Sequence, residues 1–573
     1  MTDIRRTVLW VVFTMSLVLL WDGWQKHNGH PSMFSPAPKA VSSSAPAAPA
    51  SGGGVPAATA TAAGQAPAVA ANPAAAASEK ITIHTDVLNV TVDTLGGDIV
   101  RAELPHYLTS PDPTVTDQLL QMVHLQKKPE FMPQPVVLFN EAQHYRAQTG
   151  LVGGPAALPT HNTPMTAVAG ERELKAGQEE IKLRLESAEV GGVKLVKTFT
   201  FKRGAYTVGV THEVVNVGSA PVTPQVYLQL VRDGSHVTGG AAFTPSFTGP
   251  AVYNDKTKFQ TLKFEDIDKG KVDIDKQAND GWVAMIQHYF ASAWLVNEAG
   301  SREFFVRKLP GQAGVVGDTY ASGMVFTLPT LAPGASTTQQ ATLFAGPQEE
   351  NKLAALAPGL ERVKDYGKLT ILAEPLFWLL DKIHGVLGNW GWTIVALVVL
   401  LKIALYWLNA SAYKSMAKMK AVAPRINEMK ERLKDKPQEM QQEMMKIYRE
   451  EKVNPIGGCL PIFLQMPIFM ALYWVLLSTV EMRQAPWALW ITDLSVRDPY
   501  FILPLLMMAS SLFQVWLNPP AQDPMQQKMM WIMPVAFGIM FFVFPSGLVL
   551  YWLTNNILSI AQQWLINKRL GVN

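Results

Sequence analysis

Lys402 is the residue whose position asks most directly for a chemical explanation. It lies within an apolar run, Trp390–Leu408, that is long enough to cross a bilayer. A cation near the centre of a membrane helix costs roughly 2.5–3.5 kcal/mol on insertion scales, so it usually faces a protein interior or a hydrated cavity. We therefore expect a polar cavity around Lys402, with snorkelling of its long stem toward the nearer interface as the alternative.

Polar side chains recur in three other apolar runs of the C-terminal half. They are Gln465, Ser510, Ser511, Gln514, Thr554, Asn555, Asn556 and Ser559. Taken singly, each is explained by hydrogen bonding between membrane helices. Together with Lys402 they predict a hydrated internal surface. These runs contain no Asp or Glu, so an anion that pairs with Lys402 would have to come from a bound partner.

Composition argues against several other kinds of chemistry. The chain has 573 residues, of which 48% are hydrophobic and 17% charged, and its formal net charge is +3. That charge is too small to predict a nucleic acid partner. The single cysteine, Cys459, leaves no internal disulfide framework and no CxxC metal motif. No Walker, HExxH or GxSxG motif is present. We expect no enzymatic activity, no cofactor and no sequence-specific nucleic acid partner.

The N-terminal segment reads as a membrane anchor followed by a linker. Thr7–Trp21 is apolar and follows Arg5 and Arg6, which matches the basic and apolar regions of a signal sequence. The next residues are bulky and polar rather than small, so we expect an uncleaved transmembrane helix over residues 1–24. A cleaved signal peptide is the alternative. Residues 25–79, dominated by Ala, Pro, Ser and Gly, predict a flexible linker.

Residues 80–345 predict an all-β domain. Short runs with period-2 alternation, such as Leu195–Phe201 and Tyr206–Val210, are separated by turn residues. No sustained βαβ alternation is visible, which favours a large antiparallel sandwich. Residues 346–388 follow as an amphipathic region. Within it, Asn351–Tyr366 reads as one helix that lies at the membrane interface or packs on the sandwich.

The C-terminal part predicts five membrane spans and one cytoplasmic hairpin. The spans are Trp390–Leu408, Leu460–Thr479, Tyr500–Leu517, Met529–Phe544 and Gly547–Ile566. As domains, these correspond to a second transmembrane helix over 389–409, a hairpin over 410–454, helices three to six over 455–566, and a short tail over 567–573.

Basic residues set the expected orientation. They concentrate in the hairpin and at both chain ends, so the positive-inside rule places both termini in the cytoplasm and the sandwich outside. In a bacterium with two membranes, the outside is the periplasm. The predicted fold class is a polytopic α-helical membrane protein with six transmembrane helices and a periplasmic all-β domain.

The hairpin carries methionines at helical spacing. Met416, Met419 and Met429 precede the turn, and Met440 and Met444 follow it. One interpretation is a solvated two-helix hairpin that closes on its own methionines. The other is an adaptable contact surface for varied apolar segments, because methionine fits irregular partners. The two interpretations are compatible.

Several longer motifs resemble the YidC/Oxa/Alb family of membrane protein insertases, in its Gram-negative form with a large periplasmic domain. They are Asn454–Cys459 (NPIGGC), Gln465–Phe469 (QMPIF), Arg483–Pro486 (RQAP), Asp523–Lys528 (DPMQQK) and Phe544–Trp552 (FPSGLVLYW). Further matching stretches, Gly281–Met285 in the sandwich and Ser415–Met419 in the hairpin, extend the resemblance over nearly the whole chain.

The resemblance implies a fold and a mode of action. It implies a five-helix core around a hydrophilic groove, open to cytoplasm and lipid, together with a periplasmic β-supersandwich. The expected groove residues are Lys402, Gln465, Gln514, Trp552 and Asn555. The expected client and ribosome contacts are Met416, Met419, Met429, Met440, Met444, Gln526 and Lys528. The implied partners are nascent inner-membrane proteins, the Sec translocon, the ribosome and the lipid bilayer, and the implied location is the bacterial inner membrane.

Three features depart from the family pattern. Lys402 stands where arginine is more frequent, and lysine lacks the bidentate fork of arginine. Trp552 stands where tyrosine is common, and the tail after the last span is short, so ribosome contact would fall to the hairpin and the 518–528 loop. Two other functions remain as alternatives. A transporter or channel would usually show an internal repeat, and none is visible. A sugar-modifying enzyme would place the function in the sandwich.

Overall fold

The computed structural model describes most of the chain after residue 77. The described residues are 55–56, 78–110, 115–122, 131–154, 156–235, 247–309, 318–433, 436–451, 460–518 and 524–569. The anchor predicted over 1–24 lies outside them, as does the linker predicted over 25–79 except for residues 55–56 and 78–79.

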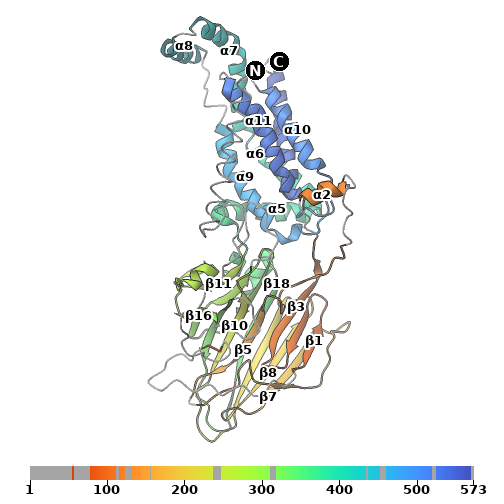
Figure 1. Cartoon of the computed structure of the whole chain (residues 1–573), viewed down its shortest axis with the longest axis vertical. Helices are drawn as coiled ribbons and strands as arrows, with labels where there is room; N and C mark the ends of the chain where they lie inside the picture. Colours follow the sequence, from red (N-terminus) through yellow and green to blue (C-terminus); the bar gives the residue numbers. More distant parts are fainter. Residues whose placement is uncertain are drawn as a thin grey trace. The chain divides into compact units, whose positions relative to one another are not determined.

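The first half of the described chain forms two β-sheets that pack face to face (Figure 1). One sheet has the order β1 (Lys80–His84), β2 (Asn89–Asp93), β3 (Asp98–Leu108), β5 (Arg146–Val152), β10 (Gln225–Asp233), β17 (Thr319–Thr327), β16 (Arg302–Leu309) and β13 (Gln277–Ala278), with β4 (Pro135–Val137) paired to β3.

The second sheet has the order β12 (Lys258–Thr261), β11 (Gly249–Asn254), β14 (Trp282–Ile286), β15 (Phe290–Leu295), β18 (Ser336–Pro347), β9 (Thr207–Asn216), β8 (Val193–Lys202), β7 (Glu180–Ser187) and β6 (Met165–Ala167). All pairings between named strands in the described part are antiparallel. Two short helices, α2 (Val115–Met122) and α3 (Phe264–Asp268), lie in loops.

Alternation in the sequence explains these strands. In β9 the even-numbered residues Val208, Val210, His212, Val214 and Asn216 are buried, and the intervening residues are only half-buried. Because strand side chains point to alternate faces, one face of β9 enters the core between the sheets. The hairpin predicted over 195–210 forms as β8 and β9, in a register that pairs Phe199 with Val210.

The core between the sheets also holds a buried polar network. Lys197 Nζ donates to the carbonyl oxygens of Gly96 at 2.6 Å and Thr149 at 2.8 Å. Gln148 Nε2 donates to Asp98 Oδ2 at 2.7 Å. Burial raises the pKa of Asp98 and lowers that of Lys197, because each charge has left water. These charges are held by partners within the sandwich.

The segment after the sandwich packs on the outer face of the second sheet. The sequence predicts one helix over Asn351–Tyr366, and this prediction is wrong. The structure has a short helix, α4 (Glu350–Leu356), and then a separate 3₁₀ turn over 360–363. Pro358 disfavours helical geometry at Ala357, which is extended, and Gly359 adopts the left-handed region with φ +75°.

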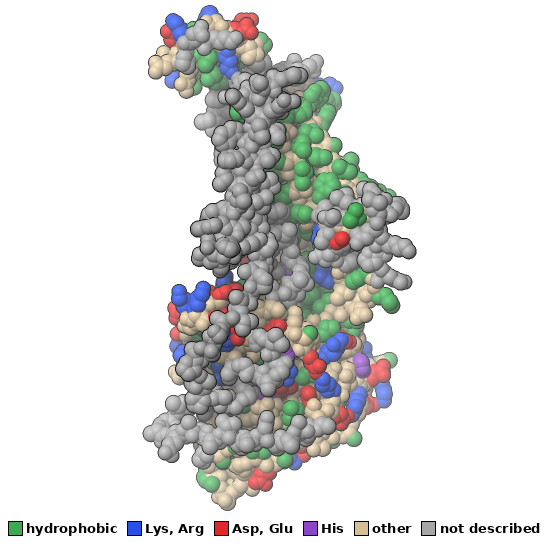
Figure 2. All heavy atoms as spheres, viewed as in Figure 1, with side chains coloured by type: hydrophobic (Ala, Val, Ile, Leu, Met, Phe, Trp, Pro, Cys, Tyr) green, Lys and Arg blue, Asp and Glu red, His purple; other side chains and the backbone are tan. Residues whose placement is uncertain are grey.

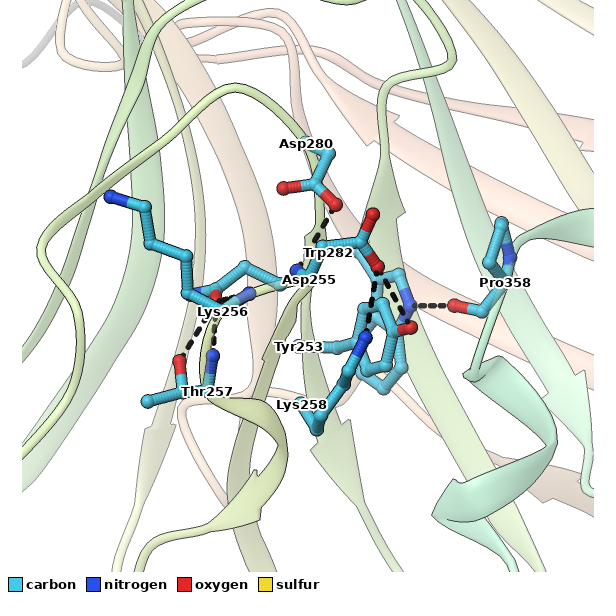
Figure 3. A network of polar contacts seen from close by, with 9 residues as sticks. Tyr253, Asp255, Lys256, Thr257, Lys258, Asp280, Trp282 and Pro358 are labelled. Carbon is cyan, nitrogen blue, oxygen red and sulfur yellow. Dashed lines mark hydrogen bonds and ion pairs between the residues drawn. The ribbon is translucent and has the colours of Figure 1, made fainter.

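This connecting segment is held against the sheet by aromatic residues. Trp282 Nε1 donates to the carbonyl oxygen of Pro358 at 3.0 Å, and the Tyr253 ring stacks on Trp282 with centroids 5.5 Å apart (Figure 3). A Cβ at Gly359 would lie 2.4 Å from the Tyr253 ring, so glycine is required there. Of the two positions considered for the amphipathic segment, the structure shows Leu353, Leu360 and Val363 packed on the sandwich.

The second half of the described chain is helical. Its helices are α5 (Thr370–Leu387), α6 (Trp390–Ala404), α7 (Tyr406–Arg432), α8 (Pro437–Glu450), α9 (Leu460–Ser478), α10 (Ile502–Leu517), α11 (Pro524–Met540) and α12 (Ser546–Arg569). α12 packs against both α6 and α10, and α5 packs against α6 and α9. A large apolar cluster that includes Ile394, Leu397, Val475, Met507 and Leu550 lies between them.

Many large apolar side chains of these helices are exposed. Figure 2 shows hydrophobic side chains gathered along the visible flank of the helices. On α10 and α11 the exposed large apolar residues are Leu505, Leu506, Phe513, Trp516, Met525, Met529, Trp531, Ile532, Met533, Val535, Phe537 and Ile539. Within the part of the chain that the structure describes, none of the helices combines the length and the apolarity needed to cross a membrane. The membrane spans predicted from the sequence therefore stay a prediction.

Candidate functional site

Lys402 lies in the last turn of α6, immediately before a break in the helix. The break falls at Leu405, and α7 begins at Tyr406. Lys402 Nζ donates to Ser559 Oγ on α12 at 2.7 Å, and that hydroxyl donates onward to the carbonyl oxygen of Asn555 at 2.7 Å. Among the described residues, no carboxylate pairs with this ammonium group. Lys402 is therefore a half-buried cation with a single hydroxyl partner.

The second polar contact of the site joins α9 to α12. Gln465 Nε2 donates to Asn555 Oδ1 at 3.1 Å. Deeper in the site, Asn556 Nδ2 donates to Ser511 Oγ at 2.7 Å and lies 3.3 Å from Ser510 Oγ, so α12 is also tied to α10. Polar residues that the sequence scatters over separate apolar runs thus meet on α6, α9, α10 and α12.

These residues line a cavity of about 200 Å³. Its polar lining comprises Lys402, Asn409, Gln465, Gln514, Asn555, Asn556 and Ser559, and its remaining lining is Met466, Phe469, Tyr551 and Trp552. All five groove residues expected from the sequence, namely Lys402, Gln465, Gln514, Trp552 and Asn555, therefore lie around one cavity. Trp552 packs its ring edge-to-face on Phe469 with centroids 4.4 Å apart, which fixes the apolar side of that cavity.

Toward the start of α6, apolar residues of α6 and α12 such as Ile394, Leu397 and Leu548 are buried in one cluster. There the loop between α9 and α10 covers the first turn of α12: Ser546 N donates to the carbonyl oxygen of Val496 at 2.7 Å, and Gly547 N to that of Leu494 at 2.9 Å. Asp498 supports this loop by accepting hydrogen bonds from Leu503 N at 2.7 Å and Trp490 Nε1 at 3.0 Å. Lys402 and Asn409 lie at the other end, near the break between α6 and α7.

Asn409 belongs to the polar lining of the cavity, but the sequence pattern did not single it out. Its spacing contained a usable signal, because about seven residues make two helical turns and place Asn409 on the same face as Lys402. Asn409 is easily overlooked because it comes directly after the apolar run Trp390–Leu408 and so lies outside the predicted span.

Most of the residues expected to contact clients or the ribosome belong to the hairpin of α7 and α8. Met429 is buried among Val422, Ile426, Ile447 and Tyr448, so α7 and α8 share a small core of their own. Met440 and Met444 pack against that core. Lys528 is exposed, and the side chains of Met416, Met419 and Gln526 lie outside the described residues.

Three of the five expected methionines therefore serve the hairpin itself. Arg425 closes the same hairpin from outside through ion pairs with Glu450 at 3.0 Å and Glu451 at 2.9 Å. Met440 and Met444 are only partly buried, so among these three methionines only a contact through Met429 would need the hairpin to open.

A second buried lysine, Lys364, lies in the segment that connects the sandwich to α5. Its side chain is fully buried, with Nζ 3.8 Å from Glu481 Oε2, 4.0 Å from Glu350 Oε2 and 3.6 Å from the centre of the Phe377 ring. Tyr366 donates its hydroxyl to Glu350. Burial lowers the pKa of Lys364 and raises those of Glu350 and Glu481.

Glu481 brings the loop after α9 into this cluster, and the next residues of that loop reach the sandwich. Arg483 Nη2 donates to the carbonyl oxygen of Leu108 at 2.7 Å, and Gln484 Nε2 donates to the same oxygen at 3.0 Å. Val480 is fully buried with the sandwich core. The Lys364 cluster is therefore part of a set of contacts between the end of α9 and the β-domain.

The β-domain and the helices with their polar, cation-bearing cavity correspond to two family models. One, described as the YidC periplasmic domain, matches residues 80–379, and the other, described as the 60Kd inner membrane protein, matches residues 382–572. Together they define the class, an inner-membrane protein with a periplasmic domain.

Full-length relatives make the family definite. Proteins named membrane protein insertase YidC from Cupriavidus necator and Ralstonia nicotianae are each 51% identical to this chain. The alignments cover 99% of this chain and 98% of the first relative, and 100% of this chain and 99% of the second. The chain belongs to the YidC family of membrane protein insertases, and the resemblance seen in its motifs is confirmed.

A solved structure adds little to this assignment. A crystal structure titled as an active YidC insertase with its first transmembrane domain resolved aligns with 85% of this chain and 92% of its own, at 18% identity and a TM-score of 0.37. The family assignment therefore rests on the full-length relatives and the two family models.

Proposed function

We propose that this insertase receives the polar head of a client, meaning a nascent inner-membrane protein, in the cavity around Lys402. The observation that carries the proposal is the unmatched charge of Lys402, which meets one hydroxyl and no carboxylate among the described residues. A cation held among apolar helices without a resident anion is costly unless a partner or water supplies the missing contacts. An acidic residue in the head of a client is such a partner.

The surroundings of Lys402 support a transfer route. The polar lining offers hydrogen bonds to a head that has left water, and this shortens the apolar barrier for that head. The exposed apolar flank of α10 and α11 is the surface that lipid would cover. The apolar helix of the client would then leave the cavity for lipid, with hydrophobic burial and the membrane potential completing the transfer.

The proposal includes the membrane topology predicted from the sequence. In this topology the chain has six transmembrane helices, and the last five form the core. Both termini are cytoplasmic and the β-domain is periplasmic. The basic hairpin and the basic C-terminal end of α12 support this orientation. The cavity then opens toward the cytoplasm, because Lys402 and Asn409 lie at the end of α6 that leads into the hairpin.

The partners beyond clients and lipid are part of the same proposal. Lys528 and the charged outer faces of α7 and α8 offer exposed groups to a ribosome. Met416, Met419, Met440, Met444 and Gln526 remain proposed contacts, as does Met429 if the hairpin opens. The Sec translocon is proposed as a second partner through the family resemblance alone.

Two variants of Lys402 test the charge-pairing step. We expect Lys402→Ala to lower insertion of a single-span client with an acidic head about tenfold, the equivalent of one lost ion pair of about 1.4 kcal/mol, and to change a neutral-head client less than twofold. Lys402→Arg should retain both. The measurement is protease protection of each client in vesicles that contain the purified protein. Equal loss on both clients, or no loss on either, would contradict charge pairing.

Crosslinking supplies an independent readout of cavity occupancy. A photoreactive residue at position 402 should capture the head of a ribosome-bound nascent membrane protein and should not capture a nascent soluble protein of equal length. Capture of both would show that the cavity does not discriminate membrane clients.

A further inference from the structure

Asn409 lines the cavity around Lys402 but lacks a complete set of hydrogen-bond partners. Its side chain is 5% exposed, and its Nδ2 group has no hydrogen-bond acceptor among the described residues. It lines the same cavity as Lys402, Gln465 and Asn555. Buried amide groups are nearly always paired in folded proteins, so an unpaired one that lines a cavity marks a position where a ligand or water belongs.

The backbone around the helix break holds Asn409 on the cavity side. Leu405 N donates to the carbonyl oxygen of Leu401 at 2.9 Å, and Asn409 N donates to that of Leu405 at 3.0 Å. The hydrogen-bond ladder therefore continues through the break, and Asn409 stays about two turns beyond Lys402 on one face. Its position is set by the backbone rather than by a bond from its own Nδ2 group.

The chemistry of the cavity limits what Asn409 can bind. Two acceptors of the lining are engaged within the cavity, since Asn555 Oδ1 accepts from Gln465 and Ser559 Oγ accepts from Lys402. Lys402 Nζ and Asn409 Nδ2 are donor groups. A ligand that pairs with these two groups brings acceptors, which a polypeptide has as main-chain carbonyl groups and as carboxylates.

A main-chain carbonyl is the acceptor that remains for Asn409. A carboxylate binds more strongly to the cation Lys402, which lines the same cavity, than to a neutral amide, so a carboxylate of the client pairs with Lys402 and leaves Asn409 a neutral acceptor. Carbonyl groups in the interior of a helix are paired within that helix, whereas an extended segment offers its carbonyl groups freely.

We propose that Asn409 is a client-binding residue that donates to a main-chain carbonyl of an extended polar segment in the cavity. The inference rests on the proposed function and assigns recognition of the client to two residues. Lys402 recognises the charge of the head, and Asn409 recognises its extended backbone, whatever its charge.

The test uses the full-length protein in vesicles and two single-span clients that differ only in an acidic or a neutral head. We expect Asn409→Leu, which removes both donors at similar volume, to lower insertion of both clients to the same degree, about fivefold for one lost hydrogen bond. Asn409→Ser, which keeps one donor, should restore at least half of the insertion. Asn409→Asp should impair both clients and the acidic one further, because its carboxylate repels that head.

A matched control separates binding from stability. Gln563 on α12 is 2% exposed and donates to Asn518 Oδ1 at 3.0 Å, and it does not line the cavity. Gln563→Leu therefore removes a buried amide without touching the proposed site. Thermal unfolding in detergent is measured for all variants. The inference holds if Asn409→Leu loses more insertion than Gln563→Leu at an equal or higher melting temperature.

Three results would overturn it. They are wild-type insertion of both clients by Asn409→Leu, a loss no larger than that of Gln563→Leu, and a loss confined to the acidic client, which would assign the acceptor to the carboxylate of the client. Failure of the proposed function gives a different pattern of results. In that case the Lys402→Ala variant inserts both clients normally, and a photoreactive residue at position 402 does not crosslink to the head of a client, whatever the result for Asn409→Leu.

Discussion

Lys364 and Lys402 are both lysines withdrawn from water, but their surroundings differ. Lys364 Nζ lies within 4.0 Å of two carboxylates and 3.6 Å from the centre of an aromatic ring. Lys402 Nζ meets one hydroxyl and borders a cavity of about 200 Å³. A lysine whose counter-ions belong to the protein stabilises the fold, whereas a lysine without a counter-ion in the protein is available to a ligand. The partners of a buried lysine, more than its burial, indicate its role.

Lys197 in the sandwich belongs with Lys364. It has two carbonyl acceptors, at 2.6 and 2.8 Å, and the charge of Asp98 acts on it from nearby. Among these three lysines, two buried and one half-buried, Lys402 alone depends on a single side-chain hydroxyl for its described contacts. This contrast supports the proposed client site at Lys402 and a structural role for the buried charges of the β-domain and its connecting segment.

Removing Lys364 should have the largest effect on stability. Lys364→Met leaves Glu350 and Glu481 buried without their cation, and loss of one partner of a buried ion pair costs about 3–5 kcal/mol. Lys402→Met removes a poorly paired charge and should change the free energy of unfolding by less than about 1 kcal/mol. Chemical denaturation of the purified protein in detergent measures both. A larger loss for Lys402→Met would break the comparison.

The second prediction concerns pH. Burial raises the pKa of Glu481 in the folded state above its ordinary value. Its contribution to stability is therefore fully present below that ordinary value and is lost as pH rises through the raised folded value. The charged neighbours that face it are Lys364, Glu350 and Glu349.

Glu481→Gln should flatten this pH dependence and cost less stability at pH 7 than Lys364→Met, because Lys364 keeps Glu350. Melting temperature measured from pH 4.5 to 7.5 provides the test. An unchanged slope in Glu481→Gln would show that this carboxyl is not the group that titrates.

The smallest effect is expected at Ser559, the hydroxyl that contacts Lys402. Ser559→Ala removes a bond worth about 0.5–1.5 kcal/mol net, and the cavity allows water or a client to replace it. We expect a stability change near the lower end of that range and near-normal insertion of an acidic-head client. A loss of insertion as large as that of Lys402→Ala would mean that Ser559 positions the lysine.

Local patterns were enough to predict much of the fold and part of the site. Alternation over residues 195–210 predicted β8 and β9, and polar residues in apolar runs predicted Gln465, Gln514 and Asn555 as companions of Lys402. These predictions succeed because side-chain direction follows directly from helix and strand period. The interruption of the segment around Pro358-Gly359 could also have been read from the sequence, since both residues disfavour a continuous helix.

Other features depend on contacts between distant segments. Glu481 and Lys364 lie far apart in the sequence, and only the packing of the loop after α9 against the connecting segment brings their charges within 4 Å. The methionines of the hairpin show the same limit. Their spacing predicts one apolar face, but spacing does not say whether that face meets the other half of the hairpin or a partner. The structure places Met429 in the core of the hairpin.

The family, the alternation of the β-domain and the cation in an apolar helix can all be read from residues that lie close together in the chain. Which lysine has a counter-ion and which lacks one depends instead on the packing of distant segments. A counter-ion acts through space, and the distance from Nζ to a carboxylate is set by how helices and loops pack rather than by their order. That difference separates Lys364, which holds the connecting segment, from Lys402 and Asn409, which face the cavity.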